Sequence, residues 1–361
     1  MQAPQLEEFL CTLPDISGKN IYVWGIGDTA NLHQESFARE ASLNICGYTV
    51  SKGYEVSDYT YWGGGQIYGK KLFSPEEVAA DPNAFVIICS YGSTETYRKI
   101  SSEINSLSLK YCTVDAAIFS LHKKELRKVF TSLDDDRSRE IYLSLLWHRV
   151  KGEYIIDDCT SWDHSFVNPA FQRAYADDVF VDCGAFVGDT IEKFIWQHDG
   201  FAKKIIAFEP DAKNRLALEK RVRRLNEEWN FSPDKITVYP YGVSDKSSVS
   251  YLRRHCDIGS DSSIASEPDD KTQEIKVVAI DDILPEGYTF LKADIESYEY
   301  KMLLGAEKTI KKYKPRLAIC IYHNATDFYS IPLLVKEFRP DYKLMIRHHS
   351  LKITETLLYA W

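Results

Sequence analysis

Acidic side chains flank a glycine-bearing segment in the C-terminal half of the chain. The segment reads VDCGAFVGDT from Val181 to Thr190, and the stretch AFEPD, which ends at Asp211, follows about twenty residues later. A pyrophosphate is bound by bare backbone N–H groups at a helix N-terminus, and anions beside them oppose it. Asp182 and Asp189 therefore argue against a dinucleotide. A ligand with a nucleoside, no phosphate and a positive centre fits better, and S-adenosylmethionine has this composition.

The predicted cofactor contacts come from this loop and from the acid after the next strand. The small residues of the loop would let the backbone approach the methionine part of the ligand closely. Asp182 or Asp189 would hold its ammonium, directly or through water, and Glu209 would accept hydrogen bonds from the ribose hydroxyls. An ordinary strand-to-helix turn capped by Asp189 is the alternative. The predicted cofactor-binding residues are Asp182, Gly184, Ala185, Gly188, Asp189, Thr190, Glu209, Val243, Ser244 and Asp294.

Two positions near this set have competing explanations. Gly242, Val243 and Ser244 are placed to line an adenine pocket, although a plain turn around Gly242 explains them nearly as well. Asp211 is positioned to cap the helix that follows, so we expect a structural role for it.

Further chemistry is expected at the ends of two later strands. Asp294 and Glu296 end the fourth strand of this region, and His323 follows the fifth. Ligands of open α/β sheets bind beyond the carboxyl ends of the strands. The carboxylates could orient an acceptor hydroxyl, act as general base or hold a divalent cation, and His323 is a natural base. We predict Asp294, Glu296 and His323 as catalytic residues and no metal, because few hard ligands are visible.

These catalytic candidates also have structural alternatives. Asp294 or Glu296 could cap the next helix, and His323 could be a packed histidine without a chemical role. Residues 347–349, Arg-His-His, could reach the same face, but we expect them in a solvated turn. The base would otherwise come from those three residues or from residues 157–175.

The motifs resemble the FkbM-type methyltransferases. The resemblance rests on VDCGAFVGDT, AFEPD and the block LKADIESYEYKMLLGAEKTIKKYKPRLAICIYH, in this order, and extends from about Leu133 to Trp361. It implies an S-adenosylmethionine-dependent enzyme, most commonly an O-methyltransferase of sugars and secondary metabolites. The chain departs from the family at Ser297, where the family's acid-x-acid-Gly has glycine. Serine restricts positive φ, so this departure concerns the detailed turn.

Alternating strands and helices must position these residues. Five buried strands in βα order are predicted at Val179–Cys183, Ile205–Phe208, Ile236–Tyr241, Tyr288–Ala293 and Leu317–Tyr322. Two more, Tyr342–Arg347 and Glu355–Trp361, are separated only by residues 348–354, which suits an antiparallel hairpin. A helix after the fourth strand carries Met302 and Ile310. The predicted fold is α/β, a seven-stranded Rossmann-like methyltransferase sheet with a terminal antiparallel hairpin.

The pattern of strands and glycines in the first third of the chain predicts a smaller Rossmann-like domain. A strand at Ile21–Trp24 precedes Gly25-x-Gly27-x-x-Ala30, a helix is expected over Leu32–Ala41, and Tyr59–Gln66 is an aromatic, glycine-rich loop. The next strand ends without an acid for a ribose, so we expect no dinucleotide here. The predicted division is a Rossmann-like domain over 1–120, a helical linker and lead-in over 121–177, and the methyltransferase domain over 178–361.

Composition limits the partners and the location. The 361 residues carry a net charge of −9, which argues against nucleic acid as a partner. The eight cysteines form no Cys-x-x-Cys pair, which suits a reducing cytoplasm. The N-terminus lacks the basic and apolar regions of a secretory signal, and no apolar run is long enough to span a membrane. A homo-oligomer is left open.

The sequence therefore predicts an S-adenosylmethionine-dependent methyltransferase that acts on a hydroxyl of a sugar, a glycan or a secondary metabolite. A small-molecule or glycan acceptor is the expected partner. An NAD-dependent sugar-modifying oxidoreductase and a non-catalytic, cofactor-binding scaffold are the alternatives.

Overall fold

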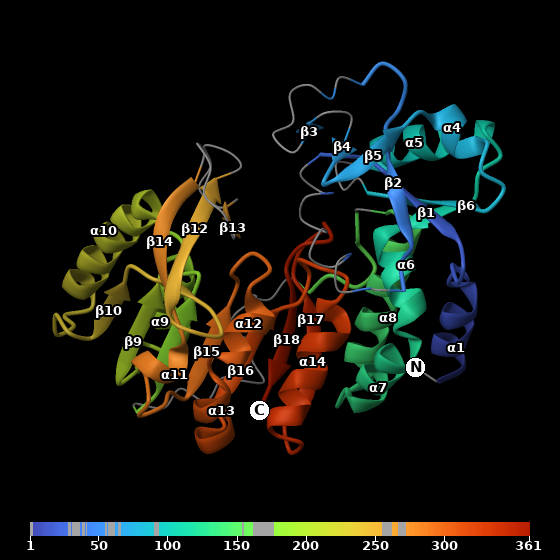
Figure 1. Cartoon of the computed structure of the whole chain (residues 1–361). Helices are drawn as coiled ribbons and strands as arrows, with labels where there is room; N and C mark the ends of the chain where they lie inside the picture. Colours follow the sequence, from blue (N-terminus) through green and yellow to red (C-terminus); the bar gives the residue numbers. More distant parts are fainter. Residues whose placement is uncertain are drawn as a thin grey trace.

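The computed structural model describes residues 3–27, 30, 37, 40, 42–54, 56, 62–63, 66–89, 94–153, 155–161, 177–254, 262–265 and 272–361. Over these residues the chain forms two seven-stranded sheets and a four-stranded sheet (Figure 1). The predicted helix over Leu32–Ala41 and most of the predicted loop over Tyr59–Gln66 and of the lead-in over 157–175 lie outside the described residues. None of the described helices has both the length and the apolar character of a membrane span.

The C-terminal sheet confirms the prediction of five parallel strands and a terminal hairpin. Its strands are β8 (Val179–Cys183), β9 (Lys204–Phe208), β10 (Ile236–Tyr239), β15 (Phe290–Ala293), β16 (Arg316–Cys320), β17 (Leu344–His348) and β18 (Thr356–Ala360). They are arranged in the order β10-β9-β8-β15-β16-β18-β17. Strand β18 is antiparallel to both β16 and β17, so the last strand of the chain enters the sheet between them.

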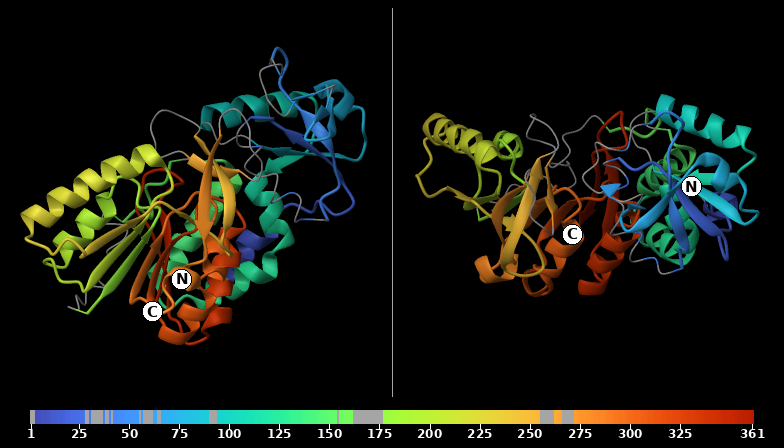
Figure 2. Two further views of the ribbon diagram at one scale, coloured as in Figure 1. Left: turned by 60° about the vertical axis from the view of Figure 1, so that its left-hand side comes forward. Right: turned by 45° about the horizontal axis from the view of Figure 1, so that its top comes forward.

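This sheet is the middle of three layers (Figure 2). Side chains of a buried strand alternate between its two faces. In β8, Phe180 belongs to a core shared with helices α9 (Asp189–Gln197) and α10 (Ala212–Glu228). Val181 belongs instead to a core that includes side chains of α12 (Glu299–Leu304), α13 (Glu307–Tyr313) and α14 (Asp327–Phe338).

The single helix predicted after the fourth strand is divided into α12 and α13. The break lies at Gly305, where a Cβ would stand 2.0 Å from the carbonyl oxygen of Ser244. The backbone of the neighbouring loop therefore comes too close for any other residue, and the helix is interrupted there.

A four-stranded sheet between β10 and β15 was not predicted. Its strands are β11 (Gly242–Val243), β12 (Ser248–Arg254), β13 (Ser262–Ala265) and β14 (Thr272–Val278), and a short helix, α11 (Ile280–Ile283), follows. Among the described residues, Leu252, Ile275 and Val277 form a small buried core there, and Val249 is 60% exposed. So few apolar side chains give too weak an alternation to predict strands from the sequence.

The N-terminal unit is a Rossmann-like layer with two extra short strands. Its strands are β1 (Asn20–Trp24), β2 (Ile45–Thr49), β3 (Trp62–Gly63), β4 (Gln66–Ile67), β5 (Lys70–Phe73), β6 (Ala84–Ile88) and β7 (Tyr111–Thr113). The order is β3-β4-β5-β2-β1-β6-β7, and the five strands from β5 to β7 are parallel. Its helices are α1 (Ala3–Thr12), α4 (Pro75–Ala79), α5 (Thr94–Ser106) and α6 (Val114–Leu121).

Two linker helices join the units, α7 (Lys123–Ser132) and α8 (Asp136–Lys151). Helix α7 packs against α14, and α8 lies beside β17 of the terminal hairpin (Figure 1). Asp135 caps α8 by accepting from the Ser138 N–H, and Gly152 ends it in the left-handed conformation. One hydrophobic core runs from Ile21 of β1, through both linker helices, to Leu344 of β17. The domain boundaries given above stay predictions, but the units that they separate share this core.

Candidate active site

A cavity of about 440 Å³ opens at the carboxyl ends of strands β8, β9, β15 and β16. The predicted residues that line it are Gly184, Asp189, Thr190, Glu209, Val243, Asp294 and Glu296. The remaining predicted residues, which are Asp182, Ala185, Gly188, Ser244 and His323, do not line it. We call its two parts the β9 end, lined by Phe208, Glu209, Tyr241, Val243 and Leu252, and the β15 end, lined by Asp294, Glu296, Tyr322, His349 and Glu355.

Asp182 lies beneath the glycine loop and not at the cavity surface. It is fully buried, and its Oδ1 lies 3.0 Å from Nζ of the buried Lys292. The same Nζ donates to the carbonyl oxygen of Gly184 at 2.8 Å. Burial raises the pKa of Asp182 to about 6, against the opposite effect of the lysine. The positive charge beside Asp182 is therefore that of Lys292, a residue of the protein itself. Lys292 also lines the cavity, and it was not identified from the sequence.

The two loop glycines are required by packing. Gly184 has φ +75°, and a Cβ there would stand 2.0 Å from the carbonyl oxygen of Asp294. Gly188 has φ +80°, and its Cβ would meet Leu218 of α10 at 2.6 Å. Both glycines thus bring the loop against its neighbours, in a backbone conformation that other residues rarely adopt. Gly188 precedes α9, and no side chain caps that helix, so the predicted alternative of Asp189 as a cap is wrong.

Glu209 stands at the end of β9 with both carboxylate oxygens held by the backbone. Oε2 accepts from the Phe186 N–H at 2.8 Å, and Oε1 accepts from the Asp211 N–H at 2.9 Å. The residue is 5% exposed, and its burial raises its pKa to about 7. The Asn214 side chain also donates to this carboxylate, which has about four lone-pair sites in all and can therefore still accept from a ligand hydroxyl. Asp211 caps α10 by accepting from the Lys213 and Asn214 N–H groups, as predicted.

The rest of the β9 end is apolar and aromatic. Val243, of the short strand β11, and Leu252, of β12, line it together with Phe208 and Tyr241. Ser244 is turned away: it is buried, its N–H donates to the carbonyl of Val278, and its hydroxyl donates to Asp245. Apolar and aromatic side chains beside a buried acid suit a nucleoside. Leu252 could not be found from the sequence, because its strand was not predicted.

Charged groups crowd the β15 end. His323 has a side chain that is 6% exposed, and its Nε2 lies 3.5 Å from Asp294 Oδ1 and 3.3 Å from Glu296 Oε2. Its Nδ1 lies 3.2 Å from Oε1 of Glu299, which is fully buried. Tyr322 donates its hydroxyl to Asp294 Oδ1 at 3.1 Å. The three predicted catalytic residues are thus brought together, with Glu299 as an addition that sequence reasoning missed.

This arrangement decides the charge of the imidazole. Burial alone would lower the pKa of His323, but Glu299 and Glu296 outweigh it and raise the pKa well above its usual value. Burial also raises the pKa of Glu296, and repulsion from Asp294 adds to this against the pull of His323. At neutral pH, His323 is therefore a cation held among carboxylates, and the group best suited to accept a proton is a carboxylate.

The same residues fit a protonated imidazole better than a metal ion. Ligand atoms of Asp294, Glu299 and His323 lie within 4.8 Å of one another. However, Asp294 approaches Nε2 of the imidazole and Glu299 approaches Nδ1. The lone pairs of these two nitrogens point in diverging directions, so an ion bonded to one of them would lie away from the carboxylate at the other. A protonated imidazole, which presents an N–H at each nitrogen, fits the two carboxylates better.

Comparison with known families agrees with the site. Residues 182–343 match the Methyltransferase FkbM domain. This part of the chain is an FkbM methyltransferase domain. The expected family is thereby confirmed, and the cofactor of the chain is S-adenosylmethionine, as the sequence predicted.

A solved structure with a TM-score above 0.5 confirms the α/β fold. Methyltransferase FkbM from Methylobacillus flagellatus KT aligns with 100% of this chain and 94% of its own, with 21% identity and a TM-score of 0.57. An rRNA methylase from Streptococcus thermophilus (15% identity, 51% of this chain, 86% of its own) has a TM-score of 0.31. A putative methyltransferase from Streptococcus mutans in complex with SAH (14% identity, 51% of this chain, 87% of its own) also has a TM-score of 0.31. No curated protein sequence matches the chain.

The backbone is strained in the loop after β15, where Ser297 departs from the family motif. Glu296 and Ser297 have φ values of +53° and +79°, a region that favours glycine. The serine thus adopts the conformation that the family's glycine would adopt freely. The Ile295 N–H donates to Glu299 Oε1 at 2.8 Å, which ties the loop to the start of α12.

The terminal hairpin, which follows the matched residues 182–343, contributes two more side chains to the β15 end, His349 and Glu355. The solvated turn expected for residues 347–349 is therefore not what the structure shows. His348 is fully buried, and Arg347 contacts Asp135 at 3.3 Å. His349 and Glu355 lie far from the motifs in the sequence, so only the strand order brings them to the cavity.

Proposed function

We propose that the chain methylates a hydroxyl oxygen of a sugar, a glycan or a secondary metabolite. The observation that carries this proposal is the β15 end of the cavity, where Glu296, with a raised pKa, faces the buried His323 cation at 3.3 Å. A hydroxyl must lose one proton when it is methylated, and a carboxylate with a raised pKa is a suitable acceptor for that proton.

The β9 end fits S-adenosylmethionine. Glu209 would hold the ribose hydroxyls with its remaining lone pairs, and Val243 and Leu252 would enclose the adenine. Asp189 and Thr190, on the first turn of α9, and the backbone at Gly184 would hold the methionine part. When bound, the cofactor supplies an activated methyl group on sulfur, which passes to the hydroxyl oxygen as the S–C bond breaks and the O–C bond forms.

The protein's own residues would then have three tasks. Asp294, oriented by the Tyr322 hydroxyl, would accept a hydrogen bond from the acceptor and orient it. Glu296 would take the hydroxyl proton as the new O–C bond forms. His323 would keep its own proton and hold Glu296 in place. Alignment can lower a barrier by ~7–11 kcal/mol in the best intramolecular cases, and a base can add about 10²–10⁴-fold in rate.

The charge of the β15 end favours an acceptor without phosphate near the reacting hydroxyl. Glu355 joins Asp294 and Glu296 there, and burial and repulsion from Asp294 raise its pKa. Lys193 of α9 also lines the cavity, and its Nζ lies 3.2 Å from Asp189 Oδ2. A phosphate would be repelled by three carboxylates, whereas a neutral polyol could donate hydrogen bonds to them.

A screen with S-adenosylmethionine labelled on its methyl group tests this function. The acceptors would include neutral sugars, glycan precursors, nucleotide sugars and hydroxylated secondary metabolites. We expect label in a base-stable ether of a neutral acceptor and little in the nucleotide sugars. Transfer to nitrogen, or to nucleotide sugars alone, would contradict the proposed acceptor. Calorimetry with NAD is the control, because NAD binding would favour the oxidoreductase, and cofactor binding without any transfer would favour the scaffold.

We place this activity in the cytoplasm. All seven cysteines of the described residues are free, which supports a reducing compartment.

A further inference from the structure

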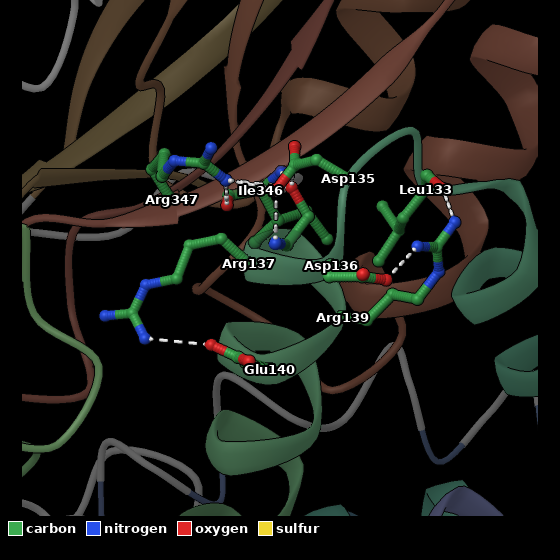
Figure 3. Close-up of polar contacts among 9 residues, drawn as sticks. Leu133, Asp135, Asp136, Arg137, Arg139, Glu140, Ile346 and Arg347 are labelled. Carbon is green, nitrogen blue, oxygen red and sulfur yellow. Dashed lines mark hydrogen bonds and ion pairs between the residues drawn. The ribbon is translucent and has the colours of Figure 1, made fainter. Parts of the chain in front are cut away.

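Helix α8 reaches the active site from outside the FkbM domain. Its first turn is attached to β17, where the Ser138 hydroxyl accepts from the Ile346 N–H at 3.0 Å and from Arg347 Nη1 at 2.8 Å. Figure 3 shows Ile346 and Arg347 of the strand beside Asp135 at the start of the helix. The helix therefore has a fixed position on the C-terminal sheet, and its other end is directed at the loop after β16.

Arg149, on the last turn of α8, joins three elements. Its Nη1 donates to Asp115 Oδ1 of α6 at 2.7 Å, and its Nη2 donates to the carbonyl oxygen of Tyr322. The guanidinium carbon also lies 4.7 Å from the ring centroid of Phe328, at the start of α14. Arg149 is 4% exposed and Asp115 is fully buried. A planar fork with several donors can hold an acid and a carbonyl at once, which a lysine cannot do.

The carbonyl that Arg149 holds belongs to the peptide that links Tyr322 to His323. On one side of this peptide, the Tyr322 hydroxyl donates to Asp294, and on the other, the imidazole of His323 faces Glu296 and Glu299. A rotation of this peptide would move both side chains. Asp327 accepts from the Asn324 N–H at 2.9 Å and holds the end of this loop. Arg149 holds its beginning, at the carbonyl of Tyr322.

We propose that Arg149, held by Asp115, is a positioning residue for methyl transfer and that it couples the N-terminal unit to the active site. The inference rests on the proposed roles of Glu296 and His323. It gives the N-terminal unit a task that needs no ligand of its own. The unit supplies Asp115, which keeps the guanidinium directed at the Tyr322 carbonyl.

The test compares full-length variants. Arg149→Met keeps an apolar side chain beside Phe328 but leaves Asp115 buried without its cation, which can unfold a protein. The double variant Arg149→Met with Asp115→Asn removes both charges and is the main probe. Leu145→Ala is the control, because Leu145 is a core residue of α8 itself and is 1% exposed. Its truncation weakens the packing of the helix while Arg149 and Asp115 are both kept.

Two readouts separate positioning from stability. In ¹⁵N-histidine NMR spectra, with the His323 signals assigned from His323→Asn, the double variant should shift or broaden those signals and Leu145→Ala should not. Turnover with the acceptor found in the screen should fall about 10²-fold in the double variant, with binding of S-adenosylhomocysteine changed less than about twofold. Arg149→Lys should lie between wild type and the double variant.

Each contrary result has a definite meaning. Unchanged His323 signals in the double variant, or an equal loss of turnover in Leu145→Ala, would overturn the positioning role. Altered His323 signals with full turnover would support the contact between Arg149 and the loop but contradict the proposed use of His323. Full turnover in Glu296→Gln would contradict the proposed base while leaving the NMR result for Arg149 in force.

Discussion

Glu209 combines a structural and a binding role in one side chain. The backbone N–H groups of Phe186 and Asp211 hold its two oxygens, and these contacts shape the loop after β8 and the start of α10. The acid is therefore fixed before any ligand arrives, which lowers the entropy cost of binding. Its motif could be recognised in the sequence, but its double role could not.

Replacing Glu209 by alanine should weaken cofactor binding. The loss of charge-assisted ribose contacts should cost about 1.5–3 kcal/mol in the affinity for S-adenosylhomocysteine, measured by calorimetry. The variant should also unfold at a lower temperature, because two backbone donors lose their acceptor. Glu219→Ala is the matched control, because Glu219 lies on α10 and its side chain is 45% exposed. It should leave the affinity for S-adenosylhomocysteine and the unfolding temperature unchanged. An unchanged dissociation constant in Glu209→Ala would contradict the ribose assignment.

The pH dependence of turnover should report on the β15 end. Glu296 must be ionised to accept a proton, and its pKa is raised, so turnover should increase as pH rises through that pKa. His323 must stay protonated, and its pKa is raised well above its usual value, so turnover should decrease as pH rises through that higher pKa. Rates measured between about pH 5 and 10 should give this bell shape. An acidic limb that persists in Glu296→Gln would rule out Glu296 as the base.

Much of the site could be predicted because its residues lie in continuous motifs at strand ends. Glu209, Asp294 and Glu296 were found in this way. Lys292 was missed because a lysine within a buried strand has no motif of its own, and only the pairing of β15 with β8 sets it beside Asp182. His323 was found, but its charge depends on Glu299, whose distance to it is a property of the fold.

At the scale of elements, the turn between β15 and α12 carries Asp294 and Glu296, and its backbone is strained. Two successive non-glycine residues, Glu296 and Ser297, have positive φ. Such strain persists where the surrounding structure determines the conformation, and it is common at functional sites. The sequence predicts a conflict at Ser297, where serine takes the place of a glycine in the turn. It could not indicate whether the turn would change or the serine would adopt the unfavourable conformation.

Replacing Ser297 by glycine should stabilise the protein. A non-glycine residue at positive φ costs roughly 1–2 kcal/mol, and the extra freedom of glycine in the unfolded chain offsets about 0.4–1 kcal/mol of this. We therefore expect the free energy of unfolding, measured with urea, to increase by up to about 1.6 kcal/mol. Ser297→Ala, which removes the hydroxyl but keeps the Cβ, is the control and should show no gain. Equal stabilities of the glycine and alanine variants would mean that φ at this position is not the source of strain.

For the whole molecule, the continuous core matters more than the boundaries between its units. Buried side chains of β1, the linker helices and the terminal hairpin belong to one cluster, in which Ile21, Leu145 and Leu344 are members. The sequence pattern predicted separate domains because periodicity describes one element at a time. It does not reveal which elements share an interior.

Thermal unfolding should therefore be one transition for both units. A ligand that binds only the folded state at 100 times its dissociation constant stabilises that state by about 2.7 kcal/mol. If the core is shared, saturation with S-adenosylhomocysteine should slow hydrogen exchange in β1 and β6 as well as in β8 and β15, although the proposed cofactor contacts all belong to the C-terminal part. Calorimetry should show a single peak that moves as a whole. Two peaks, of which the ligand moves only one, would show that the N-terminal unit unfolds independently, and its coupling to the active site through Asp115 would then lack the rigid support that it requires.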